Sequence, residues 1–129
     1  MDYDLTVRII LEDLEGKVLF LEGGNSSCEG GKLCLPGGKA YGGENLIHAA
    51  ERELMEETGI HPRILEEVFN EGRTLYFYSW LTEKAGVKLN EESSAFIWLF
   101  PAEIGSYKMA FGNGDAVRRY FHFGRNIKI

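Results

Sequence analysis

The sequence has few cysteines and no long apolar run, and each shortage excludes a class of protein. A membrane-spanning helix needs about twenty consecutive apolar residues, and the apolar run at 7–11 is far shorter. The first residues, Met1-Asp2-Tyr3-Asp4, are acidic where a secretory signal is basic. The two cysteines, Cys28 and Cys34, lack the paired C-x-x-C spacing of a zinc site. We therefore expect a cytoplasmic protein without a membrane partner, whose cysteines are reduced thiols.

Positive charge is also scarce. The 14 lysines and arginines are outnumbered by 20 aspartates and glutamates, which gives a formal net charge of −6. Binding to a nucleic-acid backbone requires a basic face, so this balance argues against nucleic acid as the main partner. An acidic protein that handles phosphates needs cations to offset the repulsion. With 129 residues, 44% of them hydrophobic, the chain is predicted to form a single domain over residues 1–129.

Apolar patterning predicts an α/β domain. Residues 5–11 and 17–21 form a predicted hairpin around the turn Asp13-Leu14-Glu15-Gly16, and residues 23–32 form a loop. Further strands are predicted at 33–35, 64–69, 74–81 and 95–100, and helices at 45–58 and 115–123. The strand 74–81 carries large side chains on both faces, which is typical of a sheet covered on both sides. The order of elements predicts a layered α/β sandwich with a mixed central sheet.

The first predicted helix has a clear beginning and end. Asn45 is a predicted N-cap, and Gly59 stands where a left-handed residue ends a helix. At 100° per residue, Ile47, Ala50 and Leu54 share one stripe, which we expect to face the sheet.

The neighbouring stripe of this helix is acidic. Glu53, Glu56 and Glu57 lie three or four residues apart and share a face, and Arg52 is spaced to reach Glu56. We expect Ala49, one turn before Glu53, to leave open space beside it. Carboxylates that converge in this way repel one another but suit a hard cation such as Mg²⁺, which prefers a few carboxylates together with water and substrate phosphate. A solvated, glutamate-rich helix face is the alternative.

The residues before the helix decide between these two interpretations. Gly38 is followed after five residues by Glu44, and Glu44 after seven residues by the run 52–60, RELMEETGI. This arrangement matches the Nudix box, G-x5-E-x7-R-E-U-x-E-E-x-G-U with U a bulky aliphatic residue, at every fixed position. On these residues the chain resembles the Nudix hydrolases (MutT-like). The resemblance implies a Nudix-type α/β/α sandwich and hydrolysis of a phosphoanhydride bond in a nucleoside diphosphate linked to a group X, with Mg²⁺, or Mn²⁺ in its place, as cofactor.

The resemblance also implies roles for individual residues. Glu53 and Glu57 match the usual metal ligands, and Glu56 matches a further ligand or the residue that activates water. Arg52 looks like the residue that orients a box carboxylate, and Glu44 like the one that steadies the loop or assists the metals. The predicted catalytic residues are Glu44, Arg52, Glu53, Glu56 and Glu57, and the predicted metal ligands are Glu53, Glu56, Glu57 and the carbonyl of Gly38.

Two more acidic residues, Glu91 and Glu92, precede the strand that contains Trp98. Many Nudix proteins place an extra carboxylate near the metals at this point, and a charged turn at the sheet edge is the alternative. Family members often have a glutamate just before the tryptophan, but here that neighbourhood reads Ala95-Phe96-Ile97. A catalytic base on this loop is therefore not predicted.

The box does not identify X, so other segments have to suggest it. ADP-ribose hydrolases of the family tend to carry a proline a short way past the box, where this chain reads Thr74-Leu75-Tyr76. Tyr76 or Tyr78 would match the tyrosine of dinucleoside polyphosphate hydrolases, with a core position as the alternative. The segment around Asn113 is similar to the one in MutT-like nucleoside triphosphate hydrolases where an asparagine meets the base, with an N-cap as the alternative.

These features favour a (d)NTP that is cleaved to NMP and pyrophosphate. The alternatives are a dinucleoside polyphosphate or a nucleotide sugar, and, from another class, a nucleotide-binding Nudix domain without turnover. The predicted partner is a small nucleotide bound through Asn113, Tyr76 and Tyr78. The oligomeric state stays open, a homodimer included.

Overall fold

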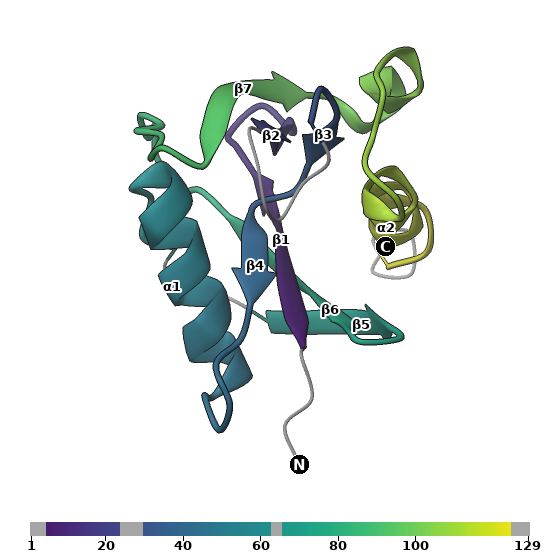
Figure 1. Ribbon diagram of the computed structural model, residues 1–129. Helices are drawn as coiled ribbons and strands as arrows, with labels where there is room; N and C mark the ends of the chain where they lie inside the picture. The colour runs from purple at the N-terminus through teal and green to yellow at the C-terminus, as the bar shows by residue number, and fades with distance from the viewer. Residues whose placement is uncertain (1–4, 24–29, 63–65, 125–129) are drawn as a thin grey trace.

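The computed structural model describes residues 5–23, 30–62 and 66–124 (Figure 1). The elements are β1 (Thr6–Glu12), β2 (Val18–Gly23), β3 (Leu33–Cys34), β4 (Gly37–Lys39), α1 (Leu46–Thr58), β5 (Glu66–Glu71), β6 (Thr74–Trp80), β7 (Ser93–Leu99), η1 (Pro101–Ser106), α2 (Asn113–Arg119) and η2 (Tyr120–Gly124). Cys28, most of the predicted loop 23–32 and the start of the predicted strand 64–69 lie outside the described residues. Within the described part of the chain, no helix is long and apolar enough to cross a membrane.

The described strands form one mixed sheet. Its main path has the order β3-β2-β1-β6-β5, while β4 also pairs with β1 and β7 with β2. β1 runs parallel to β6 but antiparallel to β2 and β4. In the turn between β1 and β2, the Asp13 carboxylate accepts hydrogen bonds from the backbone N–H groups of Glu15 and Lys17, at 2.9 and 2.8 Å. The predicted hairpin and the mixed sheet are confirmed.

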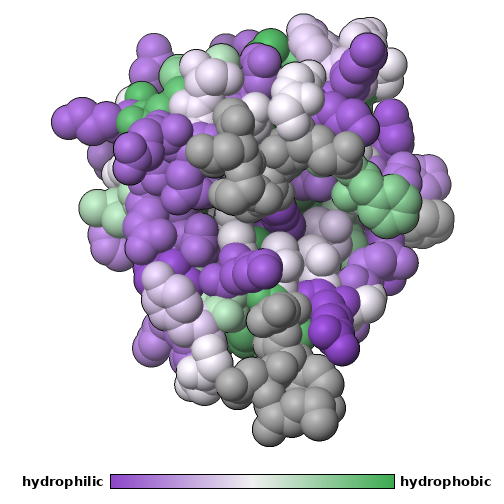
Figure 2. All heavy atoms as spheres, in the orientation of Figure 1, coloured by the Kyte–Doolittle hydropathy of each residue, from purple (hydrophilic) through white to green (hydrophobic). Residues whose placement is uncertain are grey.

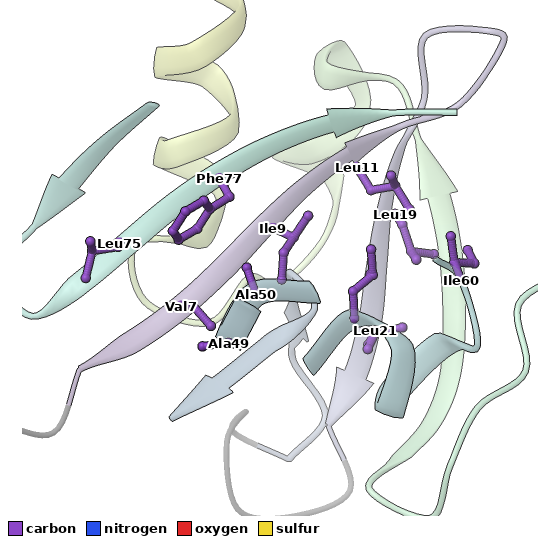
Figure 3. Packing of buried hydrophobic residues seen from close by; sticks show 11 residues of the cluster. Val7, Ile9, Leu11, Leu19, Leu21, Ala49, Ala50, Ile60, Leu75 and Phe77 are labelled. Carbon is purple, nitrogen blue, oxygen red and sulfur yellow. The ribbon is translucent and has the colours of Figure 1, made fainter. Parts of the chain in front are cut away.

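Helices cover both faces of the sheet, with α1 on one side and α2 on the other (Figure 1). Because side chains alternate along a strand, β6 directs Leu75 and Phe77 into the core beneath α1, and Tyr76 and Tyr78 into the core beneath α2. Strand residues of the first core surround Ala49 and Ala50 of α1 (Figure 3). The predicted α/β/α sandwich is therefore confirmed.

Both ends of α1 agree with the prediction, but its buried face does not. The Asn45 side chain accepts from the N–H groups of Ile47 and His48, at 3.0 and 3.1 Å. Gly59 ends the helix with a left-handed φ of 74°. The expectation that Ile47 faces the sheet is wrong, because it is 41% exposed.

The buried stripe of α1 is rotated by about one residue from the predicted one. Leu46 packs against the core where Ile47 was expected, and Ala49 is fully buried beside Ala50 and Leu54. Ala49 therefore lets the helix approach the sheet closely, and the prediction that it leaves open space beside Glu53 is wrong.

Candidate active site

The candidate site forms where β4 meets the last turns of α1. β4 pairs with β1, with Arg8 opposite Gly37 and Val7 opposite Gly38. A Cβ on Gly37 would collide with the backbone of Val7, and a Cβ on Gly38 would lie 2.5 Å from Oε1 of Glu53. Close packing against the backbone of β1 therefore requires glycine at position 37, whereas a side chain at position 38 would displace the carboxylate of a box glutamate.

Glu57 is the most buried of the box glutamates, with 3% of the residue exposed. Its Oε1 accepts a hydrogen bond from the backbone N–H of Gly37 at 2.8 Å. Burial raises the pKa of the Glu57 carboxyl to about 8; the bond from Gly37 opposes this rise, and the nearby charge of Glu53 adds to it. A bound cation stabilises the ionised form of a buried carboxylate that lies next to a second carboxylate.

Glu53 lies beside Glu57 and is held by Arg52. Burial raises the pKa of the Glu53 carboxyl, and the hydrogen bond from Arg52 opposes this rise. The charges of Glu56 and Glu92 raise the same pKa further. Glu56 is the most exposed member of the group, with 48% of its side chain accessible. In the orientation of Figure 1, the surface over α1 is mostly hydrophilic (Figure 2).

Arg52 is the cation at the centre of this acidic group. It contacts Glu44 through Nε at 2.9 Å and Nη2 at 3.0 Å, and through Nη1 it contacts Glu53 at 2.8 Å and Glu56 at 3.3 Å. The guanidinium also lies 3.9 Å from the ring centroid of Tyr41. The hydrogen bond from Arg52 lowers the pKa of Glu44, and the hydrogen bond to Glu44 raises that of Arg52.

Glu44 in turn fixes the loop before α1. Its Oε1 accepts from the backbone N–H of Tyr41 at 2.9 Å, and Arg52 Nη2 donates to the carbonyl of Lys39 at 3.2 Å. A fork-shaped guanidinium suits this arrangement, because it can serve several oxygens at fixed angles.

The oxygen atoms of this site suit a hard cation whose remaining ligands come from outside the protein. Within the described ranges, no three histidine, cysteine, aspartate or glutamate side chains converge closely enough to enclose a metal ion by themselves. Mg²⁺ is usually held by one or two carboxylates, with water and substrate phosphate completing its coordination. Glu53 and Glu57, beside the backbone of Gly38, fit that requirement.

Glu92, which was not included among the predicted site residues, belongs to the same electrostatic group. It precedes β7, and its backbone N–H donates to Oδ1 of Asn90 at 2.9 Å. Its charge contributes to the raised pKa of both Glu53 and Glu57. The pair Glu91-Glu92 was the available signal in the sequence, but nothing in it shows that the chain returns to α1 at this point.

The predicted substrate-binding residues lie on the α2 face of the sheet. Tyr76 is 4% exposed and Tyr78 is 6% exposed. The hydroxyl of Tyr78 donates to Glu12, and its ring stacks on Tyr120 with the centroids 4.4 Å apart. Both tyrosines thus pack in the core in this structure.

Asn113 is not the N-cap of α2. The cap position is Gly112, and Asn113 is the first helical residue. Its Oδ1 accepts from the backbone N–H of Leu35 at 2.9 Å, and its Nδ2 donates to the carbonyls of Phe111 at 3.1 Å and Ala110 at 3.4 Å. The capping alternative is therefore wrong, because Asn113 stands after the cap position and its Oδ1 accepts from Leu35.

Comparison with known proteins identifies the family of this chain. The model of the NUDIX domain family matches residues 2–120. The CTP pyrophosphohydrolase of Escherichia coli K12 is 29% identical over 102 residues, which cover 74% of this chain and 76% of that one. The chain belongs to the Nudix family, and the predicted enzyme class, a pyrophosphohydrolase, is confirmed.

Solved structures show the same fold. A MutT protein from Methanosarcina mazei Go1 has a TM-score of 0.77 and 25% identity, covering 98% of this chain and 96% of that one. The NUDIX domain of Shewanella oneidensis NrtR, solved with ADP ribose, has a TM-score of 0.78 and 22% identity, covering 100% and 91%.

Proposed function

We propose that this protein hydrolyses a phosphoanhydride bond of a small nucleotide at the junction of β4 and α1, with Mg²⁺ as cofactor. The observation that carries the proposal is the approach of Glu53 and Glu57 to the Gly37–Gly38 backbone. Glu57 bonds to the N–H of Gly37 at 2.8 Å, and Glu53 lies against Gly38. Two partly or fully buried carboxylates destabilise the protein unless a cation joins them.

In this proposal, Glu53 and Glu57 hold the metal and the carbonyl of Gly38 completes the protein's share of ligands. Glu56 is more exposed, so it serves as a further ligand or as the acceptor of the proton from the attacking water. Arg52 keeps Glu53 and Glu56 in place, and Glu44 anchors Arg52 to the loop. When bound there, the cation would offset the charge of the phosphate oxygens and would make water a better nucleophile.

Glu92 is a second candidate for the proton acceptor. Its charge reaches Glu53 and Glu57 from the loop before β7. Among the described residues, Arg52 pairs with Glu44, Glu53 and Glu56 but not with Glu92. Glu56 forms an ion pair with Arg52, whereas the carboxylate of Glu92 does not.

The substrate that we favour is a nucleoside triphosphate, cleaved to a nucleoside monophosphate and pyrophosphate. The resemblance of the Asn113 segment to MutT-like enzymes and the similarity to a CTP pyrophosphohydrolase both support it. Dinucleoside polyphosphates, nucleotide sugars and ADP-ribose are the competing substrates, and the NrtR domain complexed with ADP ribose is a structural relative. Binding without turnover is the alternative from another class.

A panel of nucleotides, assayed with Mg²⁺ and with chelator, tests the proposal. Products are separated by chromatography, and hydrolysis in ¹⁸O-labelled water locates the broken bond. We expect NMP and pyrophosphate, label on a phosphate product, and no turnover after chelation until Mg²⁺ or Mn²⁺ is restored. Label on a nucleoside hydroxyl, or full activity without metal, would contradict the mechanism. Tight nucleotide binding without products would favour a non-catalytic domain.

A further inference from the structure

The backbone of Leu35 is held at both its polar ends by buried side chains from two distant elements. Nη1 of Arg8, in β1, donates to the Leu35 carbonyl at 2.8 Å. Oδ1 of Asn113, at the start of α2, accepts from the Leu35 N–H at 2.9 Å. Leu35 itself is fully buried, and Arg8 and Asn113 are 8% and 5% exposed.

Leu35 is the first of a run of residues whose backbone is fixed step by step toward the candidate site. The carbonyl of Pro36 accepts from the N–H of Ile9 at 2.9 Å. The N–H of Gly37 donates to Glu57 at 2.8 Å, and Gly38 lies against Glu53. Leu35 thus precedes by two and three residues the glycines that contact the two proposed metal ligands.

An arginine is an unfavourable residue to bury at this place. Burying a charged side chain costs free energy that its partners have to offset, and the neighbouring positions of the α2-side core, such as Ile10 and Tyr76, are apolar or aromatic. The length of the arginine side chain and its fixed donor geometry allow it to reach from β1 to the carbonyl of Leu35.

We propose that Arg8 is a positioning residue of the active site: by holding the Leu35 carbonyl, it sets the position of Gly37 and Gly38 relative to Glu57 and Glu53. This inference rests on the proposed function. It predicts that Arg8 fixes the backbone of the site and touches neither metal nor nucleotide. The charge of Arg8 also acts on the Glu57 carboxyl directly, so the amide exchange at Gly37 is the measurement that isolates the backbone effect.

Arg8→Met tests the inference, because methionine keeps much of the apolar stem and removes every donor. Mn²⁺ binding is measured by electron paramagnetic resonance without nucleotide, amide exchange at Gly37 by NMR, and kcat and KM on the active nucleotide. We expect Mn²⁺ affinity to fall about 10- to 100-fold, the range found when a group that orients metal ligands is lost. Exchange at Gly37 should accelerate, and kcat should fall more than KM rises.

Two further variants complete the design. Arg8→Lys retains a donor that can reach the Leu35 carbonyl, so it should recover most of the Mn²⁺ affinity and of the protection at Gly37. Arg119→Met is the matched control, because Arg119 is half-exposed in α2 and pairs with Glu71 at 3.5 Å; it should behave as wild type. If Arg8→Met does not fold, Arg8→Gln, which keeps a polar group but is too short for the same bond, takes its place.

The outcomes separate this inference from the proposed function. Unchanged Gly37 exchange in folded Arg8→Met would overturn the inference, even if the Mn²⁺ affinity fell through the lost charge near Glu57. A rise in KM alone would assign Arg8 to nucleotide contact. A wild-type protein that binds no Mn²⁺ and cleaves no nucleotide would contradict the proposed function instead, while the exchange at Gly37 would still report whether Arg8 holds the loop.

Discussion

The N–H of Gly37 and Oε1 of Glu57 form a hydrogen bond of 2.8 Å that joins β4 to the last turn of α1. The bond leaves one carboxylate oxygen of Glu57 for other partners, in a place where burial raises the pKa of the group. Gly37 can pack closely against β1 because it carries no Cβ, which would meet the backbone of Val7. A strand glycine and a helix glutamate thus define one wall of the proposed metal site.

Replacement of Glu57 by glutamine should separate the effect of the charge of this side chain from the effect of its shape. In Glu57→Gln the side chain would retain an oxygen that accepts from Gly37 but would lose the negative charge, so kcat should fall by at least about a hundredfold. The melting temperature of the metal-free protein should hold or rise, because a buried glutamine has no ionisable group that must take up a proton on folding, as Glu57 does near neutral pH. Steady-state kinetics and thermal denaturation measure the two effects. A variant that loses stability and keeps its rate would show that the glutamate is structural.

The stability of the metal-free protein should fall as the pH rises from about 5 to about 8. The folded-state pKa of Glu57 is about 8, whereas an unfolded glutamate titrates near 4.3. Between these values the native state binds more protons than the unfolded state, so the contribution of this group to stability is fully present below the unfolded pKa and declines toward the folded one.

Thermal denaturation in chelator across this pH range checks the sign. Glu57→Gln is the control, because glutamine cannot titrate and the stability of this variant should depend less on pH. Saturating Mg²⁺ should reduce the pH dependence of the wild type in the same way, by displacing the proton from Glu57. If the stability of the wild type and of Glu57→Gln changes equally with pH, burial does not raise the pKa of Glu57.

Removal of the Arg52 guanidinium should weaken both stability and catalysis. Arg52→Met breaks contacts of 2.8–2.9 Å with Glu53 and Glu44, and we expect a loss of about 1–3 kcal/mol in urea denaturation, because these groups are largely buried. Arg52→Lys should recover only part of this stability, since a single ammonium group cannot replace the several donors of the guanidinium.

Arg118→Met is the matched control for Arg52. Arg118 is 52% exposed in its side chain and makes one contact of 3.3 Å with Asp115, so its loss should cost less than about 0.5 kcal/mol. An equal cost at the two positions would show that the Arg52 contacts add nothing specific.

Local sequence signals predicted much of this site. The helix α1 was recognisable because Asn45 and Gly59 are chemically suited to its ends, and the box fixed the identity of the glutamates. Its buried face was misjudged at Ile47 and Ala49, because the rotation of a helix against a sheet depends on what the sheet presents. A stripe drawn from the helix alone has an uncertainty of about one residue.

Features that depend on long-range contacts were missed. β4 consists of two glycines and Lys39. Glycine has no intrinsic tendency to form strands, and β4 exists because it pairs with β1. The 3₁₀-helix η1 and the early start of α2 at Asn113 were also missed. The contact of Arg8 with Leu35 and the effect of Glu92 on the glutamates of α1 depend on which segments meet, and a single sequence does not contain that information.

The last prediction concerns Asn113, whose predicted contact with the base stays a prediction. In this structure its amide holds Leu35, Phe111 and Ala110, so it would have to exchange at least one of these bonds for a base. Asn113→Ala should lower the melting temperature, because the buried N–H of Leu35 loses its acceptor. If the amide also meets the base, kcat/KM should fall by about five- to 150-fold, the equivalent of about 1–3 kcal/mol, for the preferred base and less for the others.

Asn113→Asp is the sharper test, because it keeps an acceptor for Leu35 and removes the two amide donors. A base contact through those donors predicts altered discrimination among bases with Mn²⁺ affinity unchanged, measured by competition between nucleotide pairs. Asn70→Ala is the matched control for Asn113→Ala, because it removes an asparagine side chain at an exposed position of β5. An equal fall in kcat/KM for every base, together with lower stability, would defeat the base contact and leave Asn113 as a support for Leu35, because a side chain that only positions the loop cannot distinguish one base from another.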